Sequence, residues 1–255
     1  MKMSSLVLGL LAAAAPLLSA ERDARVFEMR IYYAPAGKLD ALHARFRDHT
    51  LKLFEKHGIT NLGYWVPEGE NPERKLVYVL AYPSRAAREA SWKSFVADPD
   101  WKAAYAASEK AGKLVAKVES MYMTATDYSA AIKPGTGSKE RVFEMRTYTA
   151  SKGNLPALNS RFRDHTCKLF AKHGMVNLAY WNLMPDQKNA DTQLVYILAH
   201  DSRDAAKASF DAFRVDPDWV AARKASETKA GGSLTAATDG VKSEFLRATD
   251  YSPIR

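Results

Sequence analysis

The sequence predicts an α+β protein built from two βαββαβ repeats that pack sheet to sheet as an intramolecular barrel. Residues 25–65 and 141–181 align at a shift of 116 positions with 28 identities in 41. Both copies show strand-like and helix-like hydrophobic periods in the same order. The flexible composition of Lys133-Pro-Gly-Thr-Gly-Ser138 separates them. Two similar units in one chain can pack as an internal pseudo-dimer with a shared interface.

The first repeat, expected over residues 21–130, follows the order strand, helix, strand, strand, helix, strand. Alternating β-prone residues predict its strands at 26–33, 61–66, 75–82 and 118–126. Helical periodicity predicts a helix over 38–57 that stops at Gly58, and a second helix from the N-cap Ser84 to about 97. Asp98 and Pro99 then begin another helical turn, with Asp98 as its cap.

The second repeat, expected over 141–255 after a linker at 131–140, has the same order. Its predicted strands are 142–149, 176–183, 193–200 and 241–249, and its predicted helices are 155–173 and 202–215, with a further turn from Asp216. This is the ferredoxin-like plan, in which both helices cover one face of an antiparallel sheet. Two such sheets can cover each other's open faces, so the duplication predicts a cavity between the repeats.

The first twenty residues have the pattern of a signal peptide. Lys2 gives a positive start, Leu6–Leu18 is an apolar run, and Leu18-Ser19-Ala20 suits cleavage near Ala20. This run is shorter than the ~20 residues that span a bilayer. We therefore expect a secreted or periplasmic protein with no stable membrane anchor after cleavage.

Composition and motifs exclude several classes of function. The net charge is +8, but basic residues alternate with acidic ones along the predicted helices and no nucleic-acid motif is present, so we expect no nucleic acid partner. The lone Cys167 allows no intrachain disulfide. Metal-ligand spacing, a phosphate-binding loop and a dinucleotide fingerprint are all missing from the sequence, so we expect no metal and no cofactor.

The opening strand of each repeat supplies the first candidate binding residues. Because side chains alternate along a strand, one face is apolar and the other carries Glu28, Arg30 and Tyr32. We expect the apolar face to meet the helices and the polar face to point toward the opposite sheet. In the second repeat the equivalent residues Glu144, Arg146 and Tyr148 should also point toward the opposite sheet. These arginines either form self-contained ion pairs or anchor an anionic ligand with help from the tyrosines.

The second and third strands supply further candidates for the same cavity. We expect amide, aromatic and imidazole side chains to line it at Asn61, Trp65, Tyr78, Asn177, Trp181, Tyr196 and His200. The pattern places Asn61 and Trp65 on one strand face. Such a lining suits a small amphipathic ligand, and an aromatic core without any ligand is the structural alternative.

Histidines recur in the first helix of each repeat, but their positions favour a structural role. At 100° per residue, His57 lies within the apolar stripe, and its place beside Gly58 suits bonding to last-turn carbonyls. His165 and His173 repeat His49 and His57. A general acid–base or ligand role is the alternative.

Together these motifs resemble the NIPSNAP family. The matching segments are Val26-Phe-Glu-Met-Arg30 with Tyr32, Asn61-Leu-x-Tyr-Trp65, Leu76-Val-Tyr78 and Asp98-Pro-Asp-Trp101, each with a counterpart in the second repeat. The resemblance implies a fold of the dimeric α/β-barrel group, formed here within one chain. It implies no agreed reaction, although the wider group includes cofactor-independent monooxygenases and haem-handling enzymes that use the cavity.

We therefore expect an exported protein that binds a small anionic or aromatic molecule between its repeats. One alternative is a cofactor-independent monooxygenase or haem-handling enzyme, by analogy with the group. Another is a non-catalytic module that assembles into homo-oligomers. The sequence leaves open whether the chain is an enzyme.

Overall fold

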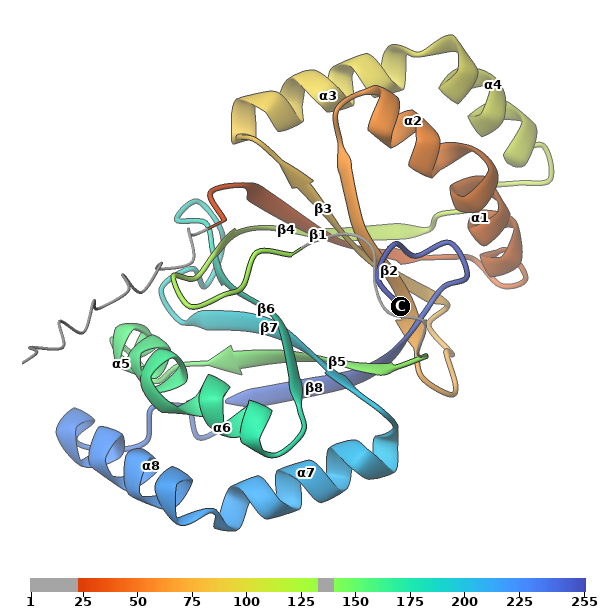
Figure 1. Cartoon of the computed structure of the whole chain (residues 1–255). Helices are drawn as coiled ribbons and strands as arrows, with labels where there is room; N and C mark the ends of the chain where they lie inside the picture. Colours follow the sequence, from red (N-terminus) through yellow and green to blue (C-terminus); the bar gives the residue numbers. More distant parts are fainter. Residues whose placement is uncertain (1–22, 133–139) are drawn as a thin grey trace, which may run out of the picture.

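The computed structural model describes residues 23–132 and 140–255. The strands in these ranges form one closed barrel in the order β1-β3-β2-β8-β5-β7-β6-β4 (Figure 1). The predicted α+β fold, with two repeats packed sheet to sheet, is confirmed. The signal peptide expected over 1–20 and most of the linker expected over 131–140 lie outside the described residues.

Each repeat contributes four neighbouring antiparallel strands. The first supplies β1 (Val26–Tyr33), β2 (Thr60–Pro67), β3 (Lys75–Tyr82) and β4 (Lys117–Ala125), in the order β4-β1-β3-β2. The second supplies β5 (Val142–Thr149), β6 (Val176–Leu183), β7 (Gln193–His200) and β8 (Val241–Ala248), in the order β8-β5-β7-β6. The barrel closes where β2 pairs with β8 and β4 pairs with β6. Both repeats therefore have the predicted ferredoxin-like arrangement.

A helical layer covers the outer face of each half of the barrel, and the two layers lie on opposite sides of the molecule (Figure 1). The first layer consists of α1 (Leu39–Arg45), η1 (Phe46–Thr50), α2 (Leu51–Lys56), α3 (Arg85–Ala97) and α4 (Pro99–Ser108). The second consists of α5 (Leu155–Arg161), η2 (Phe162–Thr166), α6 (Cys167–Lys172), α7 (Arg203–Val215) and α8 (Pro217–Ala230).

The long helix predicted over 38–57 contains a turn of π-helix, η1, that its hydrophobic pattern does not reveal. The carbonyl of Arg45 accepts a hydrogen bond from Thr50 Oγ1 at 3.1 Å, and Thr166 repeats this bond to Arg161 in η2. Such a turn inserts an extra residue and so changes which side chains face the sheet. The helix then ends as predicted, at Gly58 with φ 73°.

The predicted caps of α3 and α4 are confirmed. Ser84 accepts a hydrogen bond from the backbone of residue 87, and Asp98 accepts one from residue 100. The Nε2 of His57 donates a hydrogen bond to Asp98 Oδ2 at 2.7 Å, so this side chain joins the end of α2 to the start of α4. The expected bond from the His57 side chain to last-turn carbonyls is not formed. Hydrogen bonds from Lys56 and His57 hold the pKa of Asp98 far below its usual range. This role of His57 is structural.

The space between the two sheets is filled by apolar side chains. Phe27 lies 5.7 Å from Trp181 and Trp65 lies 5.7 Å from Phe143, measured between ring centroids. Aliphatic residues of both repeats complete this core. The expected cavity between the repeats is therefore occupied by a packed core, as in other small barrels.

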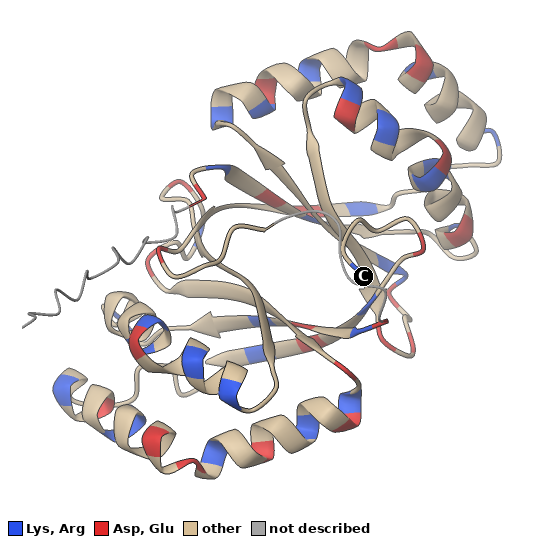
Figure 2. Ribbon diagram, viewed as in Figure 1, with Lys and Arg blue, Asp and Glu red and all other residues tan. Residues whose placement is uncertain are grey.

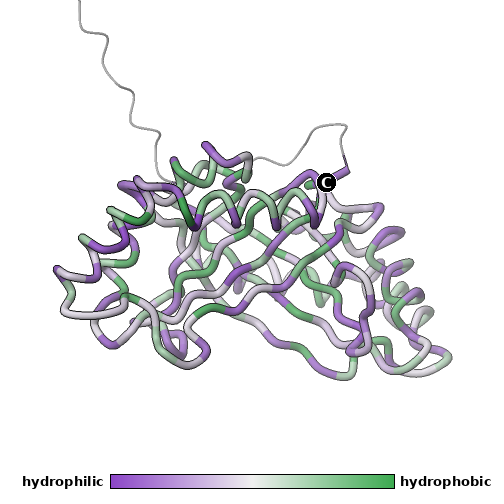
Figure 3. The backbone as a smooth tube through the Cα atoms, turned by 90° about the horizontal axis from the view of Figure 1, so that it is seen from below, coloured by the Kyte–Doolittle hydropathy of each residue, from purple (hydrophilic) through white to green (hydrophobic). Residues whose placement is uncertain are grey.

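Two further cores lie between the barrel and its helical layers. In the first repeat, Phe46 of η1 packs against Tyr64 and Tyr78 of the sheet. In the second, Phe162 makes the equivalent contacts. Figure 3 shows hydrophobic stretches both along the strands and on the helices. Every strand is therefore covered on both faces, by the opposite sheet inside and by helices outside.

Each of the two Ala-Thr-Asp-Tyr-Ser segments contacts the other repeat. After β8, Tyr251 crosses to the first repeat and places its hydroxyl 2.7 Å from His43 Nδ1. After β4, Tyr128 crosses to the second repeat and donates a hydrogen bond to Asn159 at 2.7 Å. This exchange explains why both copies end in the same residues.

Charged residues of both signs alternate along the outer helices, as Figure 2 shows. This agrees with the mixed charge pattern of the sequence. Within residues 23–132 and 140–255, no helix is long and apolar enough to cross a membrane.

Candidate functional site

The polar face of β1 points toward the helical layer, opposite to the direction expected from the sequence. Glu28, Arg30 and Tyr32 lie among side chains of α3, β3 and η1, whereas the apolar face of the strand belongs to the barrel core. Both faces of β1 are buried, so the alternation of side chains does not show which face meets the helices and which meets the opposite sheet. The second repeat departs from the prediction in the same way, at Glu144, Arg146 and Tyr148.

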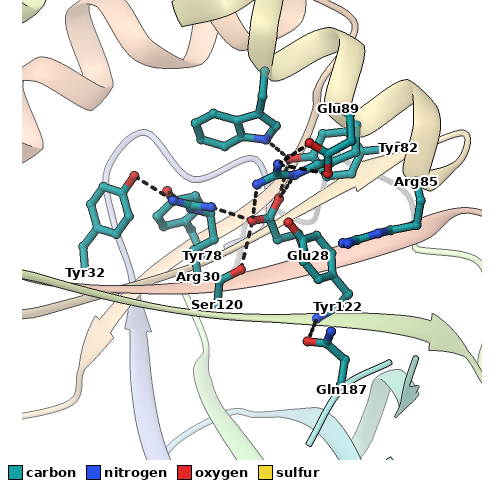
Figure 4. Close-up of polar contacts among 12 residues, drawn as sticks. Glu28, Arg30, Tyr32, Tyr78, Tyr82, Arg85, Glu89, Ser120, Tyr122 and Gln187 are labelled. Carbon is teal, nitrogen blue, oxygen red and sulfur yellow. Dashed lines mark hydrogen bonds and ion pairs between the residues drawn. The ribbon is translucent and has the colours of Figure 1, made fainter. Parts of the chain in front are cut away.

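Glu28 is the centre of a buried polar cluster (Figure 4). Its side chain is fully buried and accepts hydrogen bonds from Arg30, Ser120 and Tyr82 at 2.5, 2.9 and 2.9 Å. Arg88 of α3 adds two more bonds, each 3.0 Å long, one to each carboxylate oxygen. A buried carboxylate with this many donors is held in place and stays ionised.

The pKa of Glu28 reflects two opposing effects. Burial alone would raise this pKa, because a charged carboxylate loses its hydration. The hydrogen bond from Arg88 and the positive charges of Arg30 and Arg88 outweigh burial, so the pKa is lowered. Glu28 is therefore a structural anion and a poor proton donor near neutral pH.

Arg30 connects this cluster to the aromatic side chains above the sheet. Its Nε donates to the hydroxyl of Tyr78 at 2.9 Å, and its Nη2 donates to Tyr32 at 3.4 Å. The guanidinium also lies 4.6 Å from the ring centroid of Trp92, a cation–π distance. Sequence analysis identified Arg30, Tyr32 and Tyr78 together, and the structure brings them together on the helical side.

The second repeat builds a related cluster with fewer charges. Glu144 accepts hydrogen bonds from Arg146 and Ser243, and its Oε2 lies 3.2 Å from Nε2 of His200. Burial would raise the pKa of Glu144, but the hydrogen bond from His200 and the charge of Arg146 outweigh it and lower the pKa. Tyr196 lies 5.4 Å from Tyr148 on the same side of the sheet. The candidates of the second repeat therefore also face helices.

The expectation that Asn61 and Trp65 share a strand face is wrong. A β-bulge between Asn61 and Gly63 shifts the register of β2, which reverses the alternation beyond it. Asn61 faces the helices and bonds Tyr64, whereas Trp65 lies in the barrel core. The same bulge in β6 separates the counterparts Asn177 and Trp181.

A cavity of about 260 Å³ lies between the first sheet and its helical layer. Its walls come from the strands β1 and β4, from α1, η1, α2, α3 and α4, and from the loop after α4. Aromatic side chains dominate the lining, at Tyr32, Phe46, Phe54, Trp92, Phe95, Trp101 and Tyr105. Its size is near the lower end of small-molecule sites, and its lining is apolar with a few polar groups, as in most such sites.

Arg45 is the main polar group of this cavity. Its Nη1 donates to Glu109 at 3.1 Å and its guanidinium lies 5.2 Å from the ring of Tyr105. The residue is only 5% exposed, and its Nε has no hydrogen-bond partner within the part of the chain that the structure describes. An unpaired buried donor is costly, and because this nitrogen has almost no exposed surface, a ligand acceptor reaches it only when Arg45 shifts toward the cavity.

Sequence analysis missed four residues of this region: Arg45, Arg88, Trp92 and Glu109. They lie on helices or at a helix end, where their spacing is typical of ordinary amphipathic surfaces. One signal was present, because Arg45 precedes the identical segment Phe-Arg-Asp-His-Thr that forms the π-turn in both repeats. Within the described ranges, no group of three or more His, Cys, Asp or Glu side chains could hold a metal ion.

Comparison with protein families identifies the chain. A family model described as NIPSNAP matches residues 27–130 and 143–253. The chain belongs to the NIPSNAP family. The comparison with curated proteins gave no match.

Solved structures with the same fold cover almost the whole chain. An anthrone oxidase-like protein is 14% identical with a TM-score of 0.57, over 93% of this chain and 97% of that one. A monooxygenase candidate from Lactobacillus acidophilus NCFM is 9% identical with a TM-score of 0.53, over 89% and 94%. An uncharacterized NIPSNAP domain protein from Burkholderia xenovorans is 23% identical with a TM-score of 0.35, over 40% and 94%. The first two share the dimeric α/β-barrel fold with this NIPSNAP protein.

Proposed function

We propose that this NIPSNAP protein binds a small amphipathic molecule in the cavity between the first sheet and its helices. The observation that carries the proposal is an aromatic-lined cavity of about 260 Å³ whose wall contains Arg45, with its buried and unpaired Nε. The aromatic walls suit a flat apolar body, and Arg45 suits an acceptor group. This moves the expected site from the barrel interior to the outer side of the sheet.

Of the candidate residues named from the sequence, Tyr32 lines the cavity and Arg30 lies directly behind it. Tyr78 supports Arg30 from the sheet. Trp65 and Trp181 belong to the barrel core. We therefore assign binding to Tyr32 and Arg45, with Arg30 and Tyr78 as supporting groups.

A thermal-shift screen with aromatic carboxylates, phenols and neutral aromatic compounds tests the proposal. At least one class should raise the melting temperature of the wild-type chain, because a ligand that binds only the folded state stabilises it. Arg45→Met should abolish the shift.

The second repeat offers a matched control. Arg161 occupies the position of Arg45, donates to Glu227 at 3.5 Å and also has a buried Nε without a partner in the described ranges. Arg161→Met should therefore cause similar destabilisation but keep the ligand-induced shift. Loss of the shift in Arg161→Met alone would move the site to the second repeat and contradict the proposal.

Oxygen uptake in the presence of an identified ligand tests the enzymatic alternative. The names of the anthrone oxidase-like protein and of the Lactobacillus acidophilus protein, which share this fold, refer to oxidase and oxygenase chemistry. Uptake that depends on the ligand and disappears in Arg45→Met would extend the proposal from binding to oxygenation. Binding without uptake would leave the cavity a binding site.

A further inference from the structure

Arg88 gives the Glu28 cluster a second cation. It donates from Nε to Glu28 Oε2 and from Nη2 to Glu28 Oε1, both at 3.0 Å. Arg30 binds the same carboxylate through Oε1. Two guanidinium groups thus share one buried carboxylate, and the cluster keeps one uncompensated positive charge.

The second repeat lacks this surplus. Its α7 begins with the same Ser-Arg pair as α3, and the residue aligned with Arg88 is the fully buried Ala206. Glu144 therefore pairs with a single arginine, Arg146, and with the imidazole of His200. The one arginine and the one carboxylate of this cluster balance each other.

The surplus charge lies beside the cavity. Arg30 donates to Tyr32 at 3.4 Å and lies 4.6 Å from the ring of Trp92, and both of these residues line the cavity wall. Because Arg88 satisfies Glu28, the charge of Arg30 is available to a group on the other side of that wall. One layer of aromatic rings separates the two.

We propose that Arg88 makes the cavity of the first repeat selective for aromatic monoanions, such as carboxylates. This inference rests on the proposed function and names its ligand class. Arg88 acts as a positioning residue, because it binds Glu28 and lies 5.1 Å from the ring centroid of Trp92 but does not itself line the cavity. The second repeat, with Ala206, does not share this selectivity.

Other charges near the cluster do not cancel the surplus. Glu89 lies 3.3 Å from Arg88, but its side chain is 62% exposed. Asp186 is 55% exposed and lies 3.6 Å from Arg85, a further cation. Water and salt screen exposed carboxylates strongly, whereas the buried charges of Arg30 and Glu28 are screened far less. Lys113, which also lines the cavity, adds an exposed positive charge.

Two probes of nearly equal shape test the inference, 1-naphthoate and the neutral 1-naphthamide. Binding of each is measured by isothermal titration calorimetry at low ionic strength. At about 8 Å and an effective dielectric constant of about 20 to 40, one buried charge changes the affinity for an anion by roughly tenfold. The wild-type chain should bind naphthoate at least tenfold more tightly than naphthamide.

Arg88→Ala copies the residue of the second repeat and should reduce the ratio of the naphthoate and naphthamide affinities about tenfold. Any shift of Trp92 that affects both probes equally cancels in this ratio. Arg88→Lys keeps the charge and should keep most of the preference. Arg88→Gln keeps a donor without charge and should lose it. Lys113→Ala, which removes an exposed charge, should change the preference less than threefold, because solvent screens that charge. Circular dichroism of each variant verifies folding.

The possible results separate this inference from the proposed function. Equal binding of both probes by the wild-type chain would leave the cavity a ligand site but overturn its anion selectivity. A preference that survives in both Arg88→Ala and Arg88→Gln would overturn the role of Arg88. Binding of neither probe would count against the selectivity and the proposed site together.

Discussion

Removing the charge of Glu28 should destabilise the fold more than the same change at Glu144. Glu28→Gln leaves two guanidinium groups, Arg30 and Arg88, without a buried counter-charge, since Glu89 beside Arg88 is exposed. Glu144→Gln leaves only Arg146. The two substitutions are chemically identical and lie at equivalent positions of the two repeats, so each is a control for the other.

The magnitude follows from the cost of breaking a buried ion pair, about 3 to 5 kcal/mol when one partner is removed. The two cationic partners of Glu28 are largely buried, with side-chain exposures of 12% for Arg30 and 14% for Arg88. The cost of Glu28→Gln should therefore lie at the upper end of this range. Glu144→Gln belongs at the lower end, because only one arginine, Arg146, loses its partner. At about 2 to 4 °C per kcal/mol for a chain of this size, the melting temperatures should differ by roughly 4 to 8 °C.

Urea denaturation followed by circular dichroism measures both free energies of unfolding. The double variant Glu28→Gln with Arg88→Ala should be more stable than the sum of its single changes, by about 1 to 3 kcal/mol, because Arg88 is unfavourable once Glu28 is neutral. Equal destabilisation by Glu28→Gln and Glu144→Gln would refute the charge count for the two clusters. So would strict additivity in the double variant.

Three further predictions concern pH, packing and processing. The pKa of Glu28 is lowered from its ordinary value of 4.5, so its contribution to stability is complete above about pH 4.5 and declines as the pH falls below that value. In urea titrations below pH 4.5, the difference in unfolding free energy between wild type and Glu28→Gln should therefore become smaller. Gly63→Ala should cost about 1 to 3 kcal/mol, because the new methyl would lie 2.1 Å from Trp65, whereas Ala179→Gly at the equivalent position should cost about 1 kcal/mol; thermal melts compare them. Mass spectrometry of the mature protein from its native host should show residues up to about Ala20 removed, and an intact N-terminus there would refute export by this signal.

The order and limits of the strands and helices could be predicted because local signals determine them. Period-two patterns gave the strands to within one or two residues, and Ser84 and Asp98 are caps in the structure as expected. The duplication predicted the barrel, because the open face of each sheet must be covered by another element. The π-turn at η1 could not be predicted, because a helix of constant period fits the same residues.

The direction of the polar strand face could not be predicted from alternation. Both faces of β1 are buried, and a buried carboxylate is tolerated only where cations reach it. The decisive cation, Arg88, lies 60 residues beyond Glu28 on another element. Sequence spacing carries no information about such a contact. The bulge at Asn61 was also hidden, because Gly63 becomes Ala179 in the second repeat, so no shared glycine marks it.

The comparison between the repeats suggests where their functions diverged. Tyr32, Arg45, Trp101 and Glu109 of the cavity region recur as Tyr148, Arg161, Trp219 and Glu227. The differences lie on the helical layer and the loop after it, where Arg88, Trp92 and Lys113 are replaced by Ala206, Phe210 and Gly231. The strands must keep the barrel closed and its core filled, so they tolerate little change. The helical layer carries fewer of these constraints, so a change of charge at Arg88 can alter the ligand preference of one repeat without disturbing the shared barrel.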